Sequence, residues 1–169
     1  STVAFASYEE DKINIGKTGR IYLGDEFTQS INSRTYINKL DGRIDNSSIN
    51  YNLRFVNAST SSITFGAEEN GNQLFSQSFL GYGNSDYSVG VAHFKSTSFA
   101  GVLPDSRSVL KLKFTPTAAT SVGYLDYFEI KYDKELRTYD DNLIFFSKDT
   151  SSTIEYDLSG FSSTNIRVF

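Results

Sequence analysis

The sequence predicts an all-β protein, an antiparallel, jelly-roll-like β-sandwich of about ten strands. Three observations predict this fold. Apolar and polar side chains alternate along several segments, Phe and Tyr are abundant (14 and 11 of 169 residues), and polar turn residues recur at intervals of about 8 to 12 residues. Phe and Tyr suit strands, whereas the frequent Ser, Thr and Asn suit turns and exposed strand faces. No segment has the spacing of a long helix.

The expected strands follow in chain order. Residues 49–55 alternate strictly between apolar and polar side chains, which is the period of a half-buried strand. Residues 62–65 and 73–80 flank the turn residues 68–72, in which Asn-Gly is a strong hairpin signal. The strict alternation recurs in 110–114 and 128–132, and the remaining candidates are 87–94, 142–147, 153–158 and 165–169.

The length allows one domain with a substantial core. We expect residues 1–133 to form the jelly-roll-like sandwich. The charged stretch 134–141 is the best candidate for a boundary within the chain. Residues 134–169 are therefore expected to be either further strands of the same sandwich or the start of a following β domain. Because Phe169 lies inside an apparent strand, and because an initiator Met and a signal segment are absent, we expect a piece of a longer protein.

Composition excludes several classes of function. A net charge of −4 and a pI near 5.0 argue against a broad basic surface for nucleic acid or anionic membranes. No apolar run approaches the roughly 18 residues that span a bilayer, so no membrane insertion is expected. The sequence has no Cys, which rules out disulfides and a thiolate nucleophile.

Three segments resemble one family in order and spacing. They are residues 19–27 (GRIYLGDEF), residues 124–132 (YLDYFEIKY) followed by Leu136, and residues 159–169 (SGFSSTNIRVF). They resemble motifs of the type IX secretion sortase and related gingipain-type cysteine peptidases of Bacteroidetes. Tyr124 stands where that family usually has Trp, and Lys134 stands near a frequent Arg.

The resemblance implies an N-terminal, non-catalytic β-sandwich module upstream of a caspase-like peptidase domain. The parent would be secreted to the periplasm or cell surface, and the partners would be the adjacent peptidase domain or client proteins. The Leu-Asp-Tyr-Phe-Glu core of residues 125–129 also recurs in jelly-roll carbohydrate-binding modules. Glycan binding is therefore the alternative, although the absence of Trp weakens it.

Catalysis by this chain itself is not expected. His93 is the sole histidine, and no G-x-S-x-G nucleophile elbow occurs. One histidine without clustered partners makes a poor transition-metal site, so no metal ligand and no cofactor are assigned. Acid pairs such as Asp25 with Glu26 or Glu68 with Glu69 are interpreted as solvated turn residues. A structural Ca²⁺ ion would need two such pairs to converge.

The residues expected to contact a ligand or partner lie in surface loops. They are the acids Asp25 and Glu26 and the aromatic side chains Tyr82 and Tyr87, which flank a polar loop.

Two acids of the 124–132 strand are expected to be structural, namely Asp126 and Glu129. Asp126 shares strand parity with Phe128 and Ile130, so its carboxylate would point inward and act as a hydrogen-bond hub.

Overall fold

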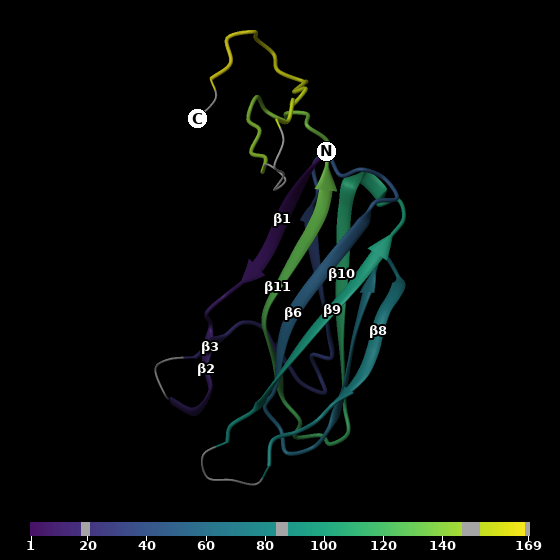
Figure 1. Ribbon diagram of the computed structural model, residues 1–169. Coiled ribbons are helices and arrows are strands. Elements are labelled where there is room, and N and C mark those ends of the chain that lie inside the picture. Colours follow the sequence, from purple (N-terminus) through teal and green to yellow (C-terminus); the bar gives the residue numbers. More distant parts are fainter. Residues whose placement is uncertain (18–20, 84–87, 147–152, 168–169) are drawn as a thin grey trace.

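Strands make up nearly all regular structure of the computed structural model, which describes residues 1–17, 21–83, 88–146 and 153–167 (Figure 1). The strands are β1 (Thr2–Glu9), β2 (Ile13–Asn14), β3 (Tyr22–Leu23), β4 (Glu26–Phe27), β5 (Ser33–Lys39), β6 (Ser48–Asn57), β7 (Ile63–Glu69), β8 (Asn72–Phe79), β9 (Val91–Ala100), β10 (Arg107–Pro116) and β11 (Gly123–Lys134). Two short 3-10 helices, η1 (Ile15–Lys17) and η2 (Pro104–Ser106), are the only helices within these ranges. No helix in them could cross a membrane.

The eight long strands form two antiparallel sheets packed face to face (Figure 1). One sheet has the order β1-β11-β6-β9, with β4 paired to the start of β11, and the other has the order β5-β10-β7-β8. The first and last long strands are neighbours, and the chain crosses repeatedly from one sheet to the other. This is the arrangement of a double-sheet jelly roll, which confirms the predicted fold class.

Aromatic rings fill the core between the sheets. Phe55 of β6 stacks on Phe65 of β7 with 3.9 Å between ring centroids. Phe27 meets both rings edge-on, at 5.6 and 6.1 Å. A Cβ atom at Gly123 would lie 2.4 Å from the ring of Phe55, so only glycine leaves room for this packing. The core therefore joins strands of both sheets through interlocked rings.

The predicted hairpin is confirmed. Asn70 and Gly71 connect β7 and β8, and both have positive φ angles of 46° and 81°. This backbone suits a two-residue hairpin turn, which Asn-Gly favours. Four further predicted strands are also confirmed. Residues 49–55 lie inside β6, residues 110–114 inside β10 and residues 128–132 inside β11, and the predicted strand 73–80 matches β8 to within one residue.

Strand prediction failed at both ends of the chain. The described parts of 142–147, 153–158 and 165–169 contain no strand, and 87–94 overlaps β9 only from Val91. In contrast, β1 and β5 were not expected. The residues of β1 that pack against the core are Ala4, Ala6 and Tyr8, of which two are small, and β5 leaves Ile37 64% exposed, so neither strand shows a clear apolar alternation.

A β-bulge in β11 corrects the expected direction of Asp126. The pairing with β6 shifts between Leu125 and Tyr127, which makes Asp126 the extra residue. Leu125 and Phe128 both face the core, three positions apart. The bulge resets the parity, so the carboxylate of Asp126 pairs with Arg54 on the outer face of the sheet.

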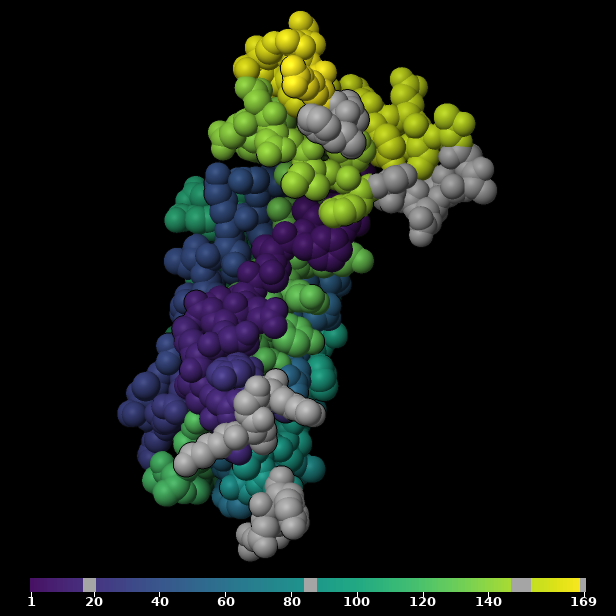
Figure 2. Space-filling view, turned by 90° about the vertical axis from the view of Figure 1, so that its left-hand side faces the viewer, coloured from purple at the N-terminus to yellow at the C-terminus, as the bar shows by residue number. Residues whose placement is uncertain are grey.

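Residues 135–146 and 153–167 form an extended segment, which we call the C-terminal arm. It lies beyond the end of the sandwich where β1 begins and β11 ends (Figures 1 and 2). The amide of Glu135 donates to the carbonyl of Gly42 at 2.8 Å, and Thr2 exchanges two hydrogen bonds with the backbone of Phe146. Among the residues that the structure describes, neither hydrophobic core cluster contains one beyond Tyr132. The sandwich core is therefore complete without the arm.

Candidate functional site

Asp25 lies between β3 and β4, in a short segment that runs beside β11. The amide of Gly24 donates to the carbonyl of Leu125 at 2.8 Å, and the amide of Leu125 donates to the carbonyl of Asp25 at 2.9 Å. A Cβ atom at Gly24 would lie 3.0 Å from the Leu125 carbonyl oxygen, so glycine permits the close approach. These contacts fix the backbone of Asp25 next to the bulge.

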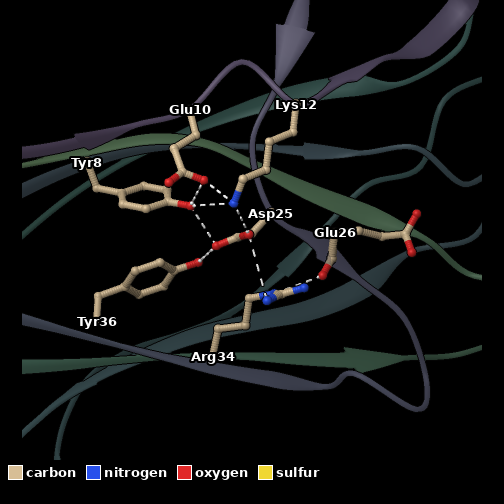
Figure 3. A network of polar contacts seen from close by, with 7 residues as sticks. All are labelled: Tyr8, Glu10, Lys12, Asp25, Glu26, Arg34 and Tyr36. Carbon is tan, nitrogen blue, oxygen red and sulfur yellow. Dashed lines mark hydrogen bonds and ion pairs between the residues drawn. The ribbon is translucent and has the colours of Figure 1, made fainter.

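The carboxylate of Asp25 collects donors from three parts of the chain (Figure 3). The hydroxyls of Tyr8 and Tyr36 donate to Oδ2 at 2.7 and 2.8 Å. Lys12 Nζ donates to Oδ1 at 3.0 Å, and the guanidinium of Arg34 lies 3.7 Å from the same oxygen. Tyr8 belongs to β1 and Tyr36 to β5, which are edge strands of different sheets. Asp25 therefore ties the two sheets together along one open edge of the sandwich.

The tyrosine rings beneath Asp25 are part of the core. The rings of Tyr8 and Tyr36 lie 4.8 Å apart, and Phe128 of β11 stacks parallel to Tyr8 at 5.4 Å. Tyr36 contacts the same Phe128 ring at 5.1 Å. The carboxylate thus caps an aromatic cluster, and its side chain is only 12% exposed.

The carboxylate of Glu26 does not take part in the hydrogen bonds around the carboxylate of Asp25. Its carboxylate turns away (Figure 3) and accepts a hydrogen bond from Tyr124 at 3.2 Å. Its backbone carbonyl accepts from Arg34 Nε at 3.0 Å. The two adjacent acids therefore bind different groups and do not form the converging pair that an acid and base would need.

Electrostatics favours the ionised form of Asp25. Burial raises the pKa of this carboxyl, but hydrogen bonds from Tyr8, Lys12 and Tyr36 and the charge of Arg34 outweigh it and hold the pKa below its usual range. Burial and the bond to Asp25 raise the pKa values of both tyrosines well above the usual range. A carboxylate saturated by protein donors is suited to holding strands together and poorly suited to proton transfer.

The other expected contact residues lie away from this network. Tyr82 is half-buried, and its amide donates to the carbonyl of Ser59 at 2.9 Å. Tyr87 lies outside the described residues. Glu129 is exposed on the outer face of its sheet, opposite Ser7 of β1 and Asn52 of β6. The structure therefore brings none of these side chains to Asp25.

Sequence reasoning missed the role of Glu69. Its side chain is fully buried and is not a solvated turn residue. Tyr51 and Ser108 donate hydroxyl hydrogen bonds to Oε2 at 2.7 and 2.6 Å, while the Val109 amide and the Asn70 side-chain amide each donate to Oε1 at 2.7 Å. Strand parity could have revealed this burial, because position 69 follows the inward positions 65 and 67 of β7.

The outer face of the sheet β1-β11-β6-β9 carries two exposed aromatic rings. Phe94 of β9 is 70% exposed, and Phe5 of β1 is 59% exposed. Arg54 lies over the Phe94 ring at 5.6 Å, and Lys131 lies over the Phe5 ring at 5.8 Å. The two rings stand on opposite edge strands and do not form one continuous platform.

No group of three or more metal-binding side chains occurs within the described ranges. The carboxylates of Glu68 and Glu69, which are adjacent in the sequence, point to different partners in the fold. Glu68 binds Lys113, while the adjacent Glu69 is buried.

Comparison with known proteins identifies similar folds. No protein-family model matches the chain, and no curated protein matches it. The crystal structure of dimeric latent PorU from Porphyromonas gingivalis matches with a TM-score of 0.64 and 20% identity, over 81% of this chain. This chain has a PorU-like fold. It spans only 13% of the PorU chain.

Two carbohydrate-binding modules match less closely, each with a TM-score of 0.46. One is CBM36 in complex with calcium and xylotriose, at 15% identity over 75% of this chain and 98% of that chain. The other is the CBM36-1 domain of a multidomain xylanase from the hindgut metagenome of Trinervitermes trinervoides. It matches at 11% identity over 76% of this chain and 95% of that chain. The likeness to PorU, at 20% identity, extends to the fold alone.

Proposed function

We propose that this chain is a non-catalytic accessory β-sandwich of a secreted or cell-surface peptidase or sortase, and that it acts through protein contacts. It would orient the neighbouring catalytic domain or dock client proteins, in the periplasm or at the cell surface. The observation that carries the proposal is the PorU-like fold, which matches 81% of this chain to 13% of a much longer protein. The motif resemblance at residues 19–27 and 124–132 points to the same family.

The chemistry of the described side chains supports a non-catalytic role. Asp25 and Glu69 are occupied by protein donors, and the ring of His93 stacks on Phe79 at 4.3 Å. His93 Nε2 also lies 2.9 Å from the Leu80 carbonyl oxygen, an acceptor that requires a proton on that nitrogen. With no Cys in the chain, the groups best suited to chemistry serve to hold strands in place.

Glycan binding has less support from the same surface. A sugar-binding face is expected to present aromatic rings beside amide and carboxylate groups. Asn52 and Glu129 do lie on the outer face, but Phe5 and Phe94 stand at opposite edges and each has a cation over its ring. Protein contact therefore remains the better-supported function.

The proposal is tested in the intact secreted protein. Deleting residues 1–134 should lower its solubility or its specific activity by about tenfold or more, because the catalytic domain would lose an orienting contact. Activity, solubility and circular dichroism would be measured together. A correctly folded protein that keeps full activity without the sandwich would contradict the proposal.

A second variant covers the case in which the shortened protein does not fold. A flexible Gly-Ser linker of about twelve residues inserted after Glu135 would leave the sandwich intact but uncouple its orientation. We expect reduced activity from this insertion as well. Unchanged activity in a folded, linker-containing protein would count against an orienting role.

A further inference from the structure

The C-terminal arm contains an apolar segment without a strand partner. Residues Leu143 to Phe146 are four consecutive apolar residues, and none of them belongs to a ladder or isolated bridge of the described chain. Ile144 is 70% exposed and Phe146 is 58% exposed, whereas Leu143 and Phe145 are half-buried. The segment therefore alternates in burial as a strand does, although it pairs with no strand.

Both faces of this segment are apolar. Successive side chains of a strand point to opposite sides, so Leu143 and Phe145 would share one face and Ile144 and Phe146 the other. A continuous apolar run of this kind is typical of a strand in a sheet that is covered on both faces. One flat apolar surface could cover only one of the two faces. The segment thus has the pattern of an inner strand, and no strand of the described residues pairs with it.

The packing around the segment is incomplete. Phe145 contacts the ring of Tyr156 at 5.0 Å, which brings the stretch 153–158 beside it. A cavity of about 780 Å³ remains in the arm, and its lining mixes apolar side chains, such as Leu143 and Leu158, with polar ones, such as Asn142. Well-packed interiors contain few voids larger than a water molecule. The described part of the arm is thus packed less completely than the core of the sandwich.

The sandwich cannot fill this arm from its own core. The core ends at Tyr132, and the arm is attached through the hydrogen bonds of Glu135 with Gly42 and of Phe146 with Thr2. These bonds, together with an edge-on contact between the rings of Phe146 and Phe5 of β1 at 6.3 Å, hold the apolar segment at the end of the sandwich. Within the described residues, no strand of the sandwich pairs with Leu143–Phe146.

We infer that residues 142–146, with 153–158 beside them, form the strand through which this sandwich joins a β-sheet of the next domain of the same secreted protein. The inference rests on the proposed function, because it specifies the contact surface of the accessory module. The occupant is an exposed sheet edge flanked by apolar side chains, which would pair with the backbone of Leu143–Phe145 between the bonded residues Asn142 and Phe146 and cover the exposed apolar side chains. The size of the PorU chain relative to this one fits a neighbouring domain of the same polypeptide.

Hydrogen exchange measured by mass spectrometry tests this inference, on the chain 1–169 alone and on the intact secreted protein. We expect the amides of residues 143–145 to exchange rapidly in the chain alone and about 100-fold more slowly in the intact protein, whereas the Phe146 amide already donates to Thr2. The amides of β6 and β11 should be protected in both samples.

Two matched substitutions in the intact protein sharpen the test. Ile144→Asp should reduce the protection of residues 143–145 by about tenfold or more, because a charge would enter an apolar face. Phe94→Asp is the control, since Phe94 is also 70% exposed but lies on the outer face of β9. It should leave the protection unchanged. Equal effects of the two substitutions would overturn the inference.

The remaining outcomes separate the inference from the proposed function. Slower exchange elsewhere on the sandwich, with residues 143–145 still unprotected, would overturn the inference and leave a contact function standing. No change anywhere in residues 1–146 would overturn both. Protection that appears in the chain alone and rises with its concentration would instead identify a second copy as the partner, which also overturns the inference.

Discussion

Replacing Glu69 by alanine is expected to lower the free energy of unfolding by about 3–5 kcal/mol. The substitution leaves the buried hydroxyls of Tyr51 and Ser108 and the amide of Val109 without their acceptor. Each unsatisfied buried donor costs about 1–3 kcal/mol, and the lost packing adds to this cost. Urea denaturation monitored by circular dichroism measures the difference.

Glu68→Ala is the matched control for this prediction. Glu68 is adjacent in β7, but its 20% exposed side chain forms an ion pair with the partly exposed Lys113. Such pairs contribute about 1 kcal/mol or less. If the two alanine variants lost similar stability, Glu69 would not be the buried hydrogen-bond centre described above.

Replacing Asp25 by alanine is expected to cost about 2–4 kcal/mol, the second largest effect. The hydroxyls of Tyr8 and Tyr36 would lose their shared acceptor, and Lys12 and Arg34 would lose a counter-charge. Because this carboxylate joins β1 to β5, hydrogen exchange in β1 should accelerate before global unfolding. Denaturation together with hydrogen exchange measures both effects.

Glu10→Ala is the control within the same cluster. Glu10 contacts Tyr8 and Lys12, but its side chain is 43% exposed, so its removal should lower the free energy of unfolding far less than Asp25→Ala does. A loss as large as that of Asp25→Ala would show that general surface charge, and not the buried carboxylate, stabilises this edge.

The contribution of Asp25 should also depend on pH. Its pKa is lowered in the folded protein, so its stabilisation is fully present above the ordinary carboxyl pKa of about 3.9. That stabilisation is lost as the pH falls through the lower, folded-state pKa. The difference in unfolding free energy between the original chain and Asp25→Ala should therefore shrink in strongly acidic solution.

Alternation made the central strands predictable. In residues 49–55 the buried and exposed sides are chemically distinct, so the pattern alone locates β6. In β1 the inward residues Ala4 and Ala6 are small, so the two faces of the strand differ little in hydrophobicity. At Asp126 a single extra residue reverses the parity without any marker in the sequence. Periodicity therefore locates strands with strong contrast and does not locate bulges.

Sequence patterns did not predict the C-terminal arm or the hydrogen-bond network around Asp25, for a different reason. Residues 142–146 have the composition of a strand, but composition does not reveal whether a partner strand is present. The donors around Asp25 come from positions 8, 12, 34 and 36, which only the pairing of β1 and β5 with their sheets brings together. Such convergence depends on topology, which a single sequence does not specify.

We expect the Asp25 network to be structural and not catalytic, because protein donors occupy its carboxylate. The most direct test is the pKa of Asp25 measured by carbon-detected NMR titration of its side-chain carboxyl in the chain 1–169. A structural carboxylate held by these donors should have a pKa below the ordinary carboxyl value of about 3.9. A value raised to about 6 or above, as an acid catalyst working near neutral pH requires, would contradict it.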